Sequence, residues 1–297
     1  MDEVDWARLV ADVRDGDCTP FLGAGACHGT LPTGGQLSET WAVDHMYPLG
    51  DRDDLPRVMQ YVAIRTRDAV SVKQRLARNL SGIGPPDFAD PAEPHGLLAR
   101  LPIPVYLTTN YDDFMVRALR SAGKAPSSAI CRWYRDAAAV DEVFSTGQGF
   151  NPRPEAPIVY HLHGSFQEPR SLVLTEEDYL EFLINMALDK ANSERKLIPA
   201  SILRAITSKP LLFIGYSLQD WTFRVLFHGL LQMISGVQLR RHVSVQLSPV
   251  DKEADPDAHQ RAKDYLTSYF DRQNISIYWG TASEFCTELR SRLGWSP

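Results

Sequence analysis

Cysteine is scarce in this chain, and no pair of cysteines has the spacing of a metal or redox motif. The 297 residues include four cysteines, Cys18, Cys27, Cys131 and Cys286, which lie far apart and form no Cys-x-x-Cys pair. This pattern argues against a disulfide scaffold and a zinc ribbon, and it suits a reducing compartment. We therefore expect a cytoplasmic protein that folds without a disulfide or a metal ion.

Long apolar runs and an excess of basic residues are also missing. No stretch approaches the roughly 18 apolar residues of a membrane-spanning helix, and the start, MDEVDWARLV, lacks the basic and apolar segments of a signal peptide. The formal net charge is −6, whereas a chain whose main work is binding nucleic acid is usually basic. We expect neither membrane insertion nor direct nucleic-acid binding.

Common signatures of nucleotide binding and hydrolysis are incomplete. FLGAGACHG at 21–29 has His28 where the dinucleotide fingerprint has its third glycine. GYSLQ at 215–219 ends on glutamine where the serine-hydrolase elbow needs glycine. The glycines at 21–29 are therefore compatible with either a tight left-handed turn or a loop whose backbone approaches a pyrophosphate.

The chain does contain a regular alternation of apolar, β-rich runs with helical patterns. This alternation is typical of an α/β protein with a Rossmann-like, doubly wound parallel sheet that helices cover on both faces. We treat 1–297 as one domain whose core covers about 15–30, 101–165 and 208–297, with helical insertions at about 31–100 and 166–207 that form a smaller lobe. Strands are predicted in CTPFL, IPVYLTT, AICRWY, PIVYHLH, PLLFIGYS, HVSVQL and ISIYW, and helices include 111–123 and 221–234.

Small and polar residues follow four of the predicted strands at their carboxyl ends. In a doubly wound sheet, ligands bind beyond these ends, so the four groups are expected to converge on one crevice. They are Gly23, Ala24 and Gly25; Thr109, Asn110, Tyr111 and Asp112; His163, Gly164 and Ser165; and Gly215, Tyr216 and Ser217.

Purely structural explanations also exist for the polar members of these groups. Asn110 or Asp112 would be a suitable cap for the helix at 111–123, and the ring of His163 could bond only to the backbone. His161 shares a strand face with His163, but no third ligand at a metal spacing is identifiable, so no metal site is expected.

FLGAGA, LTTNYDD, YHLHGS and FIGYSLQD together resemble, in this order, the motifs of sirtuin-like NAD-binding domains. The likeness is strongest to the bacterial sirtuin-like branch found in antiphage defence systems, and it spans residues 21–220. The resemblance implies NAD⁺ as the substrate. It also implies that Asn110 orients the ribose or an attacking water, that Asp112 holds the nicotinamide carboxamide, and that His163 is the catalytic histidine near the ribose.

The resemblance assigns the remaining candidates to NAD⁺ binding. The first glycine loop would cradle the phosphates, the Tyr111 backbone would help hold the carboxamide, and the group after PLLFI would line the adenosine side. The implied binding residues are Gly23, Ala24, Gly25, Thr109, Tyr111, Gly164, Ser165, Gly215, Tyr216 and Ser217.

Two departures from protein-deacylating sirtuins bear on the reaction. The four-cysteine zinc module is missing, and HGTLPTGGQLSETWA replaces the Gly-Ile-Pro-Asp-Phe-Arg-like stretch after the glycine loop. Both disfavour deacylation and suit an NAD⁺ glycohydrolase (NAD⁺ nucleosidase) that releases nicotinamide and ADP-ribose. The resemblance implies an antiphage effector that depletes NAD⁺ in abortive infection.

Other readings and the control of the activity stay open at this point. An NAD- or ADP-ribose-binding sensor without turnover is the alternative, followed by a deacylase or an ADP-ribosyltransferase. Because unrestrained NAD⁺ hydrolysis is toxic to its host, we expect control by a homo-oligomer, by a separate defence partner such as an ATPase or a nucleic-acid-guided sensor, or by both.

Overall fold

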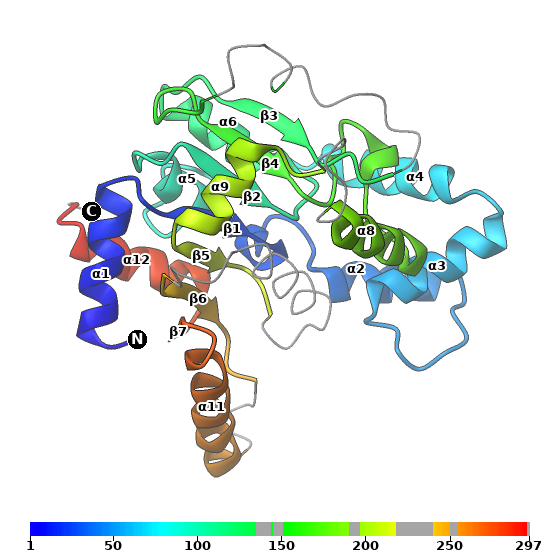
Figure 1. Cartoon of the computed structure of the whole chain (residues 1–297). Helices are drawn as coiled ribbons and strands as arrows, with labels where there is room; N and C mark the ends of the chain where they lie inside the picture. The colour runs from blue at the N-terminus through cyan, green and yellow to red at the C-terminus, as the bar shows by residue number, and fades with distance from the viewer. Residues whose placement is uncertain (135–143, 145–150, 190–196, 218–239, 250–254, 296–297) are drawn as a thin grey trace.

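The computed structural model describes most of the chain (Figure 1). The predicted helix at 221–234 lies outside the described residues. Those residues are 1–134, 144, 151–189, 197–217, 240–249 and 255–295.

One sheet of seven parallel strands forms the centre of the described fold (Figure 1). Its strand order is β3-β4-β2-β1-β5-β6-β7, so the chain begins in the middle, builds one half of the sheet and then crosses β1 to build the other. This confirms the predicted doubly wound α/β fold and puts the switch point between β1 and β5. The strands are β1 (Thr19–Leu22), β2 (Val105–Thr108), β3 (Ser127–Ile130), β4 (Ile158–His161), β5 (Leu211–Ile214), β6 (His242–Gln246) and β7 (Ile275–Trp279).

The register of the four central strands determines where the site can form. Leu22 at the end of β1 pairs with Thr108 of β2 and with Ile214 of β5, and Thr108 in turn pairs with His161 of β4. The four strands therefore end level with one another. The residues that follow them meet at one edge of the sheet, as the sequence predicted.

Helices cover both faces because each has an apolar stripe that it buries against the sheet. Side chains of α1 (Glu3–Arg14), α5 (Pro94–Ala99), α6 (Phe114–Ser121) and α12 (Ala282–Arg292) share one buried cluster with the strands. Residues of α8 (Glu176–Asp189), α9 (Ala200–Ser208) and α11 (Pro256–Asp271) belong to the cluster on the other face. Among the described residues, no helix combines the length and apolar character needed to cross a membrane.

A third buried cluster lies outside the sheet, among α2 (Gly34–Asp44), α3 (Leu55–Thr66) and α4 (Ala69–Ser81). Each helix begins at a side chain that accepts a backbone N–H bond: Thr33, Asp54 and Asp68. Leu172 and Leu174, which follow β4, complete this core. We propose that α2, α3 and α4 form the smaller lobe of a single domain.

Candidate functional site

The glycine loops after β1 and β5 pack backbone against backbone. The Gly25 N–H donates to the Gly215 carbonyl at 2.9 Å. A Cβ on Gly25 would lie 2.8 Å from the Cα of Gly215, and a Cβ on Gly215, whose φ is +83°, would lie 2.2 Å from the nitrogen of Ala26. Contact between the two loops therefore requires these glycines, a reason that the sequence alone did not suggest. Ala24, in the short helix η1 (Ala24–Cys27), is exposed beside them.

Asn110 joins the end of β2 to the first glycine loop. Its Nδ2 donates to the Gly23 carbonyl at 3.0 Å and contacts the Cys27 Sγ at 3.3 Å. Its backbone N–H donates to the hydroxyl of Thr108 at 2.9 Å. The side chain is half-buried, and these contacts engage its amide nitrogen.

Thr109 and Tyr216 form a second connection across the switch point. Their hydroxyl oxygens lie 2.7 Å apart, and the Tyr216 hydroxyl donates to the Leu22 carbonyl at 2.9 Å. Because tyrosine has one hydroxyl proton, Thr109 is the donor of the first bond. The buried Gln246 amide donates to the Tyr216 carbonyl at 2.7 Å, whereas Ser217 is exposed.

The side chains of Asp112 and Tyr111 both form hydrogen bonds with the backbone of neighbouring segments. One carboxylate oxygen of Asp112 accepts the Phe114 N–H at 2.9 Å, at the start of α6, and the other lies 3.4 Å from the Cys27 Sγ. A cap-like role therefore accounts for half of the Asp112 carboxylate. The Tyr111 hydroxyl donates to the Val173 carbonyl at 2.6 Å, and burial raises the pKa of this phenol well above its ordinary value.

His161, at the end of β4, and His163, which follows the strand, have different surroundings. His161 Nδ1 lies 3.3 Å from the Asn110 carbonyl. The ring of His163 instead packs edge-on against Tyr179 and Phe182 of α8, with centroids 5.4 and 5.1 Å away. Burial lowers the pKa of His163 to about 3, so its ring is neutral near pH 7. Its Nε2 is buried and has no hydrogen-bond partner among the described residues.

The loop after His163 is held by its own side chains. Gly164 has φ +87°, and a Cβ there would lie 2.2 Å from the carbonyl oxygen of Ser171. The N–H of Ser165 donates to the Ser171 hydroxyl at 3.1 Å, and the Ser165 hydroxyl accepts the Gln167 N–H at 3.3 Å. In this structure Gly164 and Ser165 thus shape the loop that carries His163.

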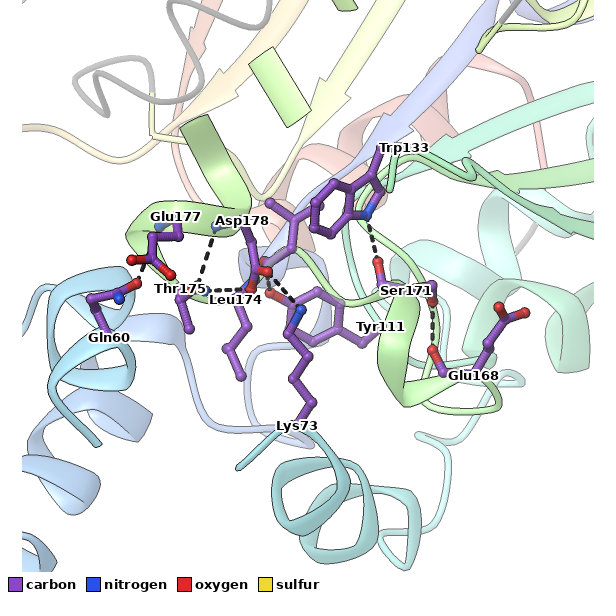
Figure 2. Close-up of polar contacts among 11 residues, drawn as sticks. Gln60, Lys73, Tyr111, Trp133, Glu168, Ser171, Leu174, Thr175, Glu177 and Asp178 are labelled. Carbon is purple, nitrogen blue, oxygen red and sulfur yellow. Dashed lines mark hydrogen bonds and ion pairs between the residues drawn. The ribbon is translucent and has the colours of Figure 1, made fainter. Parts of the chain in front are cut away.

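A buried ion pair joins the smaller lobe to this loop (Figure 2). Lys73 of α4 reaches Asp178 at the start of α8, with Nζ 2.7 Å from Oδ1 and side chains that are 7% and 13% exposed. Asp178 also accepts the backbone N–H groups of Leu174 and Thr175 at 3.0 and 2.8 Å. The pair therefore fixes the beginning of α8, the helix that encloses the ring of His163.

Replacing Lys73 with methionine is expected to lower the free energy of unfolding by about 3 kcal/mol, because it leaves Asp178 as a buried charge without its cation. Denaturant unfolding would measure the loss. Arg57→Met is the matched control: Arg57 pairs with Asp51, but its side chain is 52% exposed, so a much smaller change is expected. Equal changes in the two variants would contradict this account of the pair.

Four residues near the site were not identified from sequence: Cys27, Glu93, His95 and Gln246. Cys27 and Gln246 lie in or beside loops that follow strands, and that position was a usable signal. Glu93 and His95 precede β2 in a Pro-rich stretch, and nothing in the sequence there indicated a place in the site.

His95 Nδ1 lies 2.6 Å from a Glu93 carboxylate oxygen, and its Nε2 lies 4.0 Å from the Cys27 Sγ. Burial, followed by the charge of Asp112, raises the pKa of the Cys27 thiol well above its usual value.

Part of this chain matches a known protein family and several named relatives. A model of the SIR2-like domain matches residues 104–276, more than half of the chain. The chain is 24% identical over 217 residues to the NAD(+) hydrolase ThsA of Acinetobacter baumannii (strain 532279), a match that covers 72% of this chain and 39% of that protein. It is 27% identical over 207 residues to the protein of the same name from Bacillus cereus (strain MSX-D12), covering 69% and 39%.

A third relative, the NAD(+) hydrolase ThsA of Cytobacillus dafuensis, is 34% identical over 128 residues, which cover 43% of this chain and 22% of the relative. The matches thus extend over less than half the length of these relatives. Residues 104–276 include the level ends of β2, β4 and β5, the loop after β2 and the His-Gly turn after β4. By this match and this geometry, the chain belongs to the SIR2-like domain family.

Proposed function

We propose that this chain is an NAD⁺ glycohydrolase, which cleaves NAD⁺ to nicotinamide and ADP-ribose. The observation that carries the proposal is the buried Nε2 of His163, which lacks a partner among the described residues and follows a strand that ends level with those leading to Asn110 and the two glycine loops. The names of the relatives described above, which are NAD(+) hydrolases, support it.

The reaction needs groups that hold a bent NAD⁺ and place a water molecule. Nicotinamide leaves the anomeric carbon as a neutral molecule, and positive charge develops on the ribose. With its Nδ2 engaged by Gly23 and Cys27, Asn110 can turn its amide oxygen to a water or a ribose hydroxyl. Asp112 and the Tyr111 backbone would hold the carboxamide.

His163 has a specific part in this scheme. A histidine whose pKa is lowered to about 3 by burial is a weak base but a competent hydrogen-bond acceptor. We infer that His163 orients a ribose hydroxyl through Nε2 and accepts a proton only as charge builds up on the ribose. Tyr179 and Phe182 exclude water from its ring.

The remaining candidates would contact the rest of NAD⁺. Gly23, Ala24 and Gly25 would offer backbone to the phosphates, and Gly215, Tyr216 and Ser217 would line the adenosine side. Thr109 would support Tyr216 through their hydroxyl contact. Gly164 and Ser165 would act through the loop that carries His163.

We also propose that the activity serves antiphage defence by depleting NAD⁺ in the cytoplasm, in the manner of abortive infection. The support is the order of the four strand-end motifs, which resembles the defence branch of sirtuin-like domains. Restraint would come from a homo-oligomer or from a separate partner, such as an ATPase or a nucleic-acid-guided sensor.

The decisive experiment incubates the purified chain with NAD⁺ at several protein concentrations, alone and with the protein encoded beside it, and measures nicotinamide and ADP-ribose by chromatography. Equal release of both products is expected. Calorimetric binding of NAD⁺ without product under every condition would favour a sensor instead. Nicotinamide release that depends on an acyl-peptide would favour a deacylase.

A further inference from the structure

Three side chains of the types that bind metal ions form a compact cluster next to Asn110. Cys27 comes from η1, His95 from the first turn of α5 and Asp112 from the loop after β2. The Cys27 Sγ is 3.4 Å from an Asp112 oxygen and 4.0 Å from His95 Nε2. One ligand atom from each residue lies within 4.8 Å of the others, and all three residues are buried.

The spacing of these atoms is close to that of a tetrahedral metal site. Metal–ligand bonds of 2.0–2.3 Å in a tetrahedron put neighbouring ligand atoms about 3.5 Å apart. The distance from the Cys27 Sγ to Asp112 already meets this value, and the distance to His95 exceeds it by about half an ångström. The third pair, His95 and Asp112, lies within 4.8 Å. Small side-chain rotations would bring all three atoms to one ion.

The charges around the cluster favour a cation. Asp112 and Glu93 are buried carboxyl residues, each 8% exposed. Within the part of the chain that the structure describes, neither forms an ion pair with a lysine or an arginine. Their basic neighbours are two histidines, His95 beside Glu93 and His161 near Asp112. Buried carboxylates are costly unless they are paired or bound to a metal. Hydrogen bonds compensate only part of the negative charge of Asp112 and Glu93, and a bound cation would offset the rest.

Glu93 occupies the position of a supporting carboxylate. It contacts His95 Nδ1 at 2.6 Å, and this leaves Nε2 facing Cys27. Histidines that bind metals commonly donate a hydrogen bond from the N–H of the other ring nitrogen to a carboxylate. This bond fixes the orientation of the ring and raises the basicity of the ligating nitrogen. A second acceptor oxygen of Glu93 is held by the Gly96 N–H, so the carboxylate is itself anchored.

The same residues resemble a cysteine–histidine–glutamate nucleophile set, but the geometry disfavours that use. An activated cysteine needs electropositive surroundings. Here the carboxylate of Asp112 accepts a hydrogen bond from the Cys27 thiol, and a thiolate would face that negative oxygen. A metal ion between the sulfur and the oxygen removes this conflict, because both become ligands.

We propose that Cys27, His95 and Asp112 bind a zinc ion in a site with one open position, and that Glu93 orients His95. A mixed sulfur, nitrogen and oxygen set suits zinc better than magnesium or calcium. The site adjoins Asn110, whose Nδ2 is 3.3 Å from the Cys27 Sγ. If the proposed function holds, zinc would draw Asp112 away from nicotinamide and inhibit NAD⁺ cleavage.

Cobalt(II) substitution tests metal binding without any NAD⁺. The reduced, metal-stripped 297-residue chain, titrated with Co²⁺, is expected to develop a near-ultraviolet thiolate-to-cobalt band and the visible bands of tetrahedral cobalt, saturating at one equivalent. Zinc should abolish both. Failure of the wild-type chain to show the thiolate band would overturn the proposal whatever the variants do.

Variants then assign the ligands. Cys27→Ser should lose the thiolate band, and His95→Gln should weaken Co²⁺ binding at least tenfold. Cys286→Ser, which alters another buried cysteine, should keep both the band and the affinity. A thiolate band that persists in Cys27→Ser, or that disappears in Cys286→Ser with its fold intact by circular dichroism, would contradict the assignment.

A separate assay follows NAD⁺ cleavage with and without zinc. Inhibition in the wild type that is relieved in His95→Gln would support the regulatory role. Cobalt binding without NAD⁺ cleavage would overturn the proposed function and its inhibition by zinc, and would leave the metal site standing. NAD⁺ cleavage without cobalt binding would overturn the metal site and its inhibitory role, and would leave the proposed function standing.

Discussion

Asn110→Ala is expected to lower the rate of NAD⁺ cleavage by about 100-fold or more, with little change in the free energy of unfolding. The half-buried amide bonds to Gly23 and Cys27, so in the proposed mechanism it is pre-positioned to place the water or the ribose hydroxyl, and loss of such positioning has an effect of this size. Steady-state release of nicotinamide would measure it, with the loss in kcat rather than in KM.

The control for this variant is Asn79→Ala, which removes the same amide from an exposed position on α4 and should leave the rate unchanged. His163→Ala should match Asn110→Ala in its effect on kcat. Full activity in both site variants would refute the assignment of Asn110 and His163 and would leave NAD⁺ cleavage by the chain standing.

Gly215→Ala is expected to destabilise the fold by about 3 kcal/mol or more and to abolish NAD⁺ cleavage. Its φ of +83° is unfavourable for a residue with a side chain, and the new Cβ would lie 2.2 Å from the Ala26 nitrogen and 2.6 Å from the Gly23 carbonyl oxygen. The conformational strain is about 1–2 kcal/mol, and the overlap with backbone adds about 1–3 kcal/mol. Relief of the overlap would move the glycine loop after β1.

Gly123→Ala separates the conformational strain from the overlap with backbone. Gly123 ends the helix pattern after β2 with a φ of +79°, close to the φ of Gly215, but a Cβ there would meet no heavy atom within 4 Å. This variant should lose about 1–2 kcal/mol from strain alone and keep its activity. Equal unfolding free energies for the two variants, by denaturant titration, would show that contact between the glycine loops is not tight.

The pattern of residues along the chain was sufficient to predict the α/β fold and to predict that the candidate residues meet at one edge of the sheet. Apolar β-rich runs that alternate with helical patterns leave few arrangements other than a parallel sheet, and parallel strands bring their carboxyl ends to one edge. TTNYDD after β2 and HGS after β4 were therefore recognisable as neighbours, although they are far apart in the sequence. Local sequence also determines where α8 starts, because a cap acts within a few residues: Thr175 and Asp178 bond to each other's backbone N–H groups.

Only the tertiary structure decided which polar groups meet behind these strand ends. Cys27 meets His95 across 68 residues and Asp112 across 85, and Lys73 meets Asp178 across 105. No periodicity links positions so far apart, because their contact depends on how whole helices dock. The burial of His163 beneath α8 and the contact between Gly25 and Gly215 have the same origin. Local pattern determined the elements of this protein and their order, and packing between elements determined the charge, the exposure and the partners of each group in the candidate site.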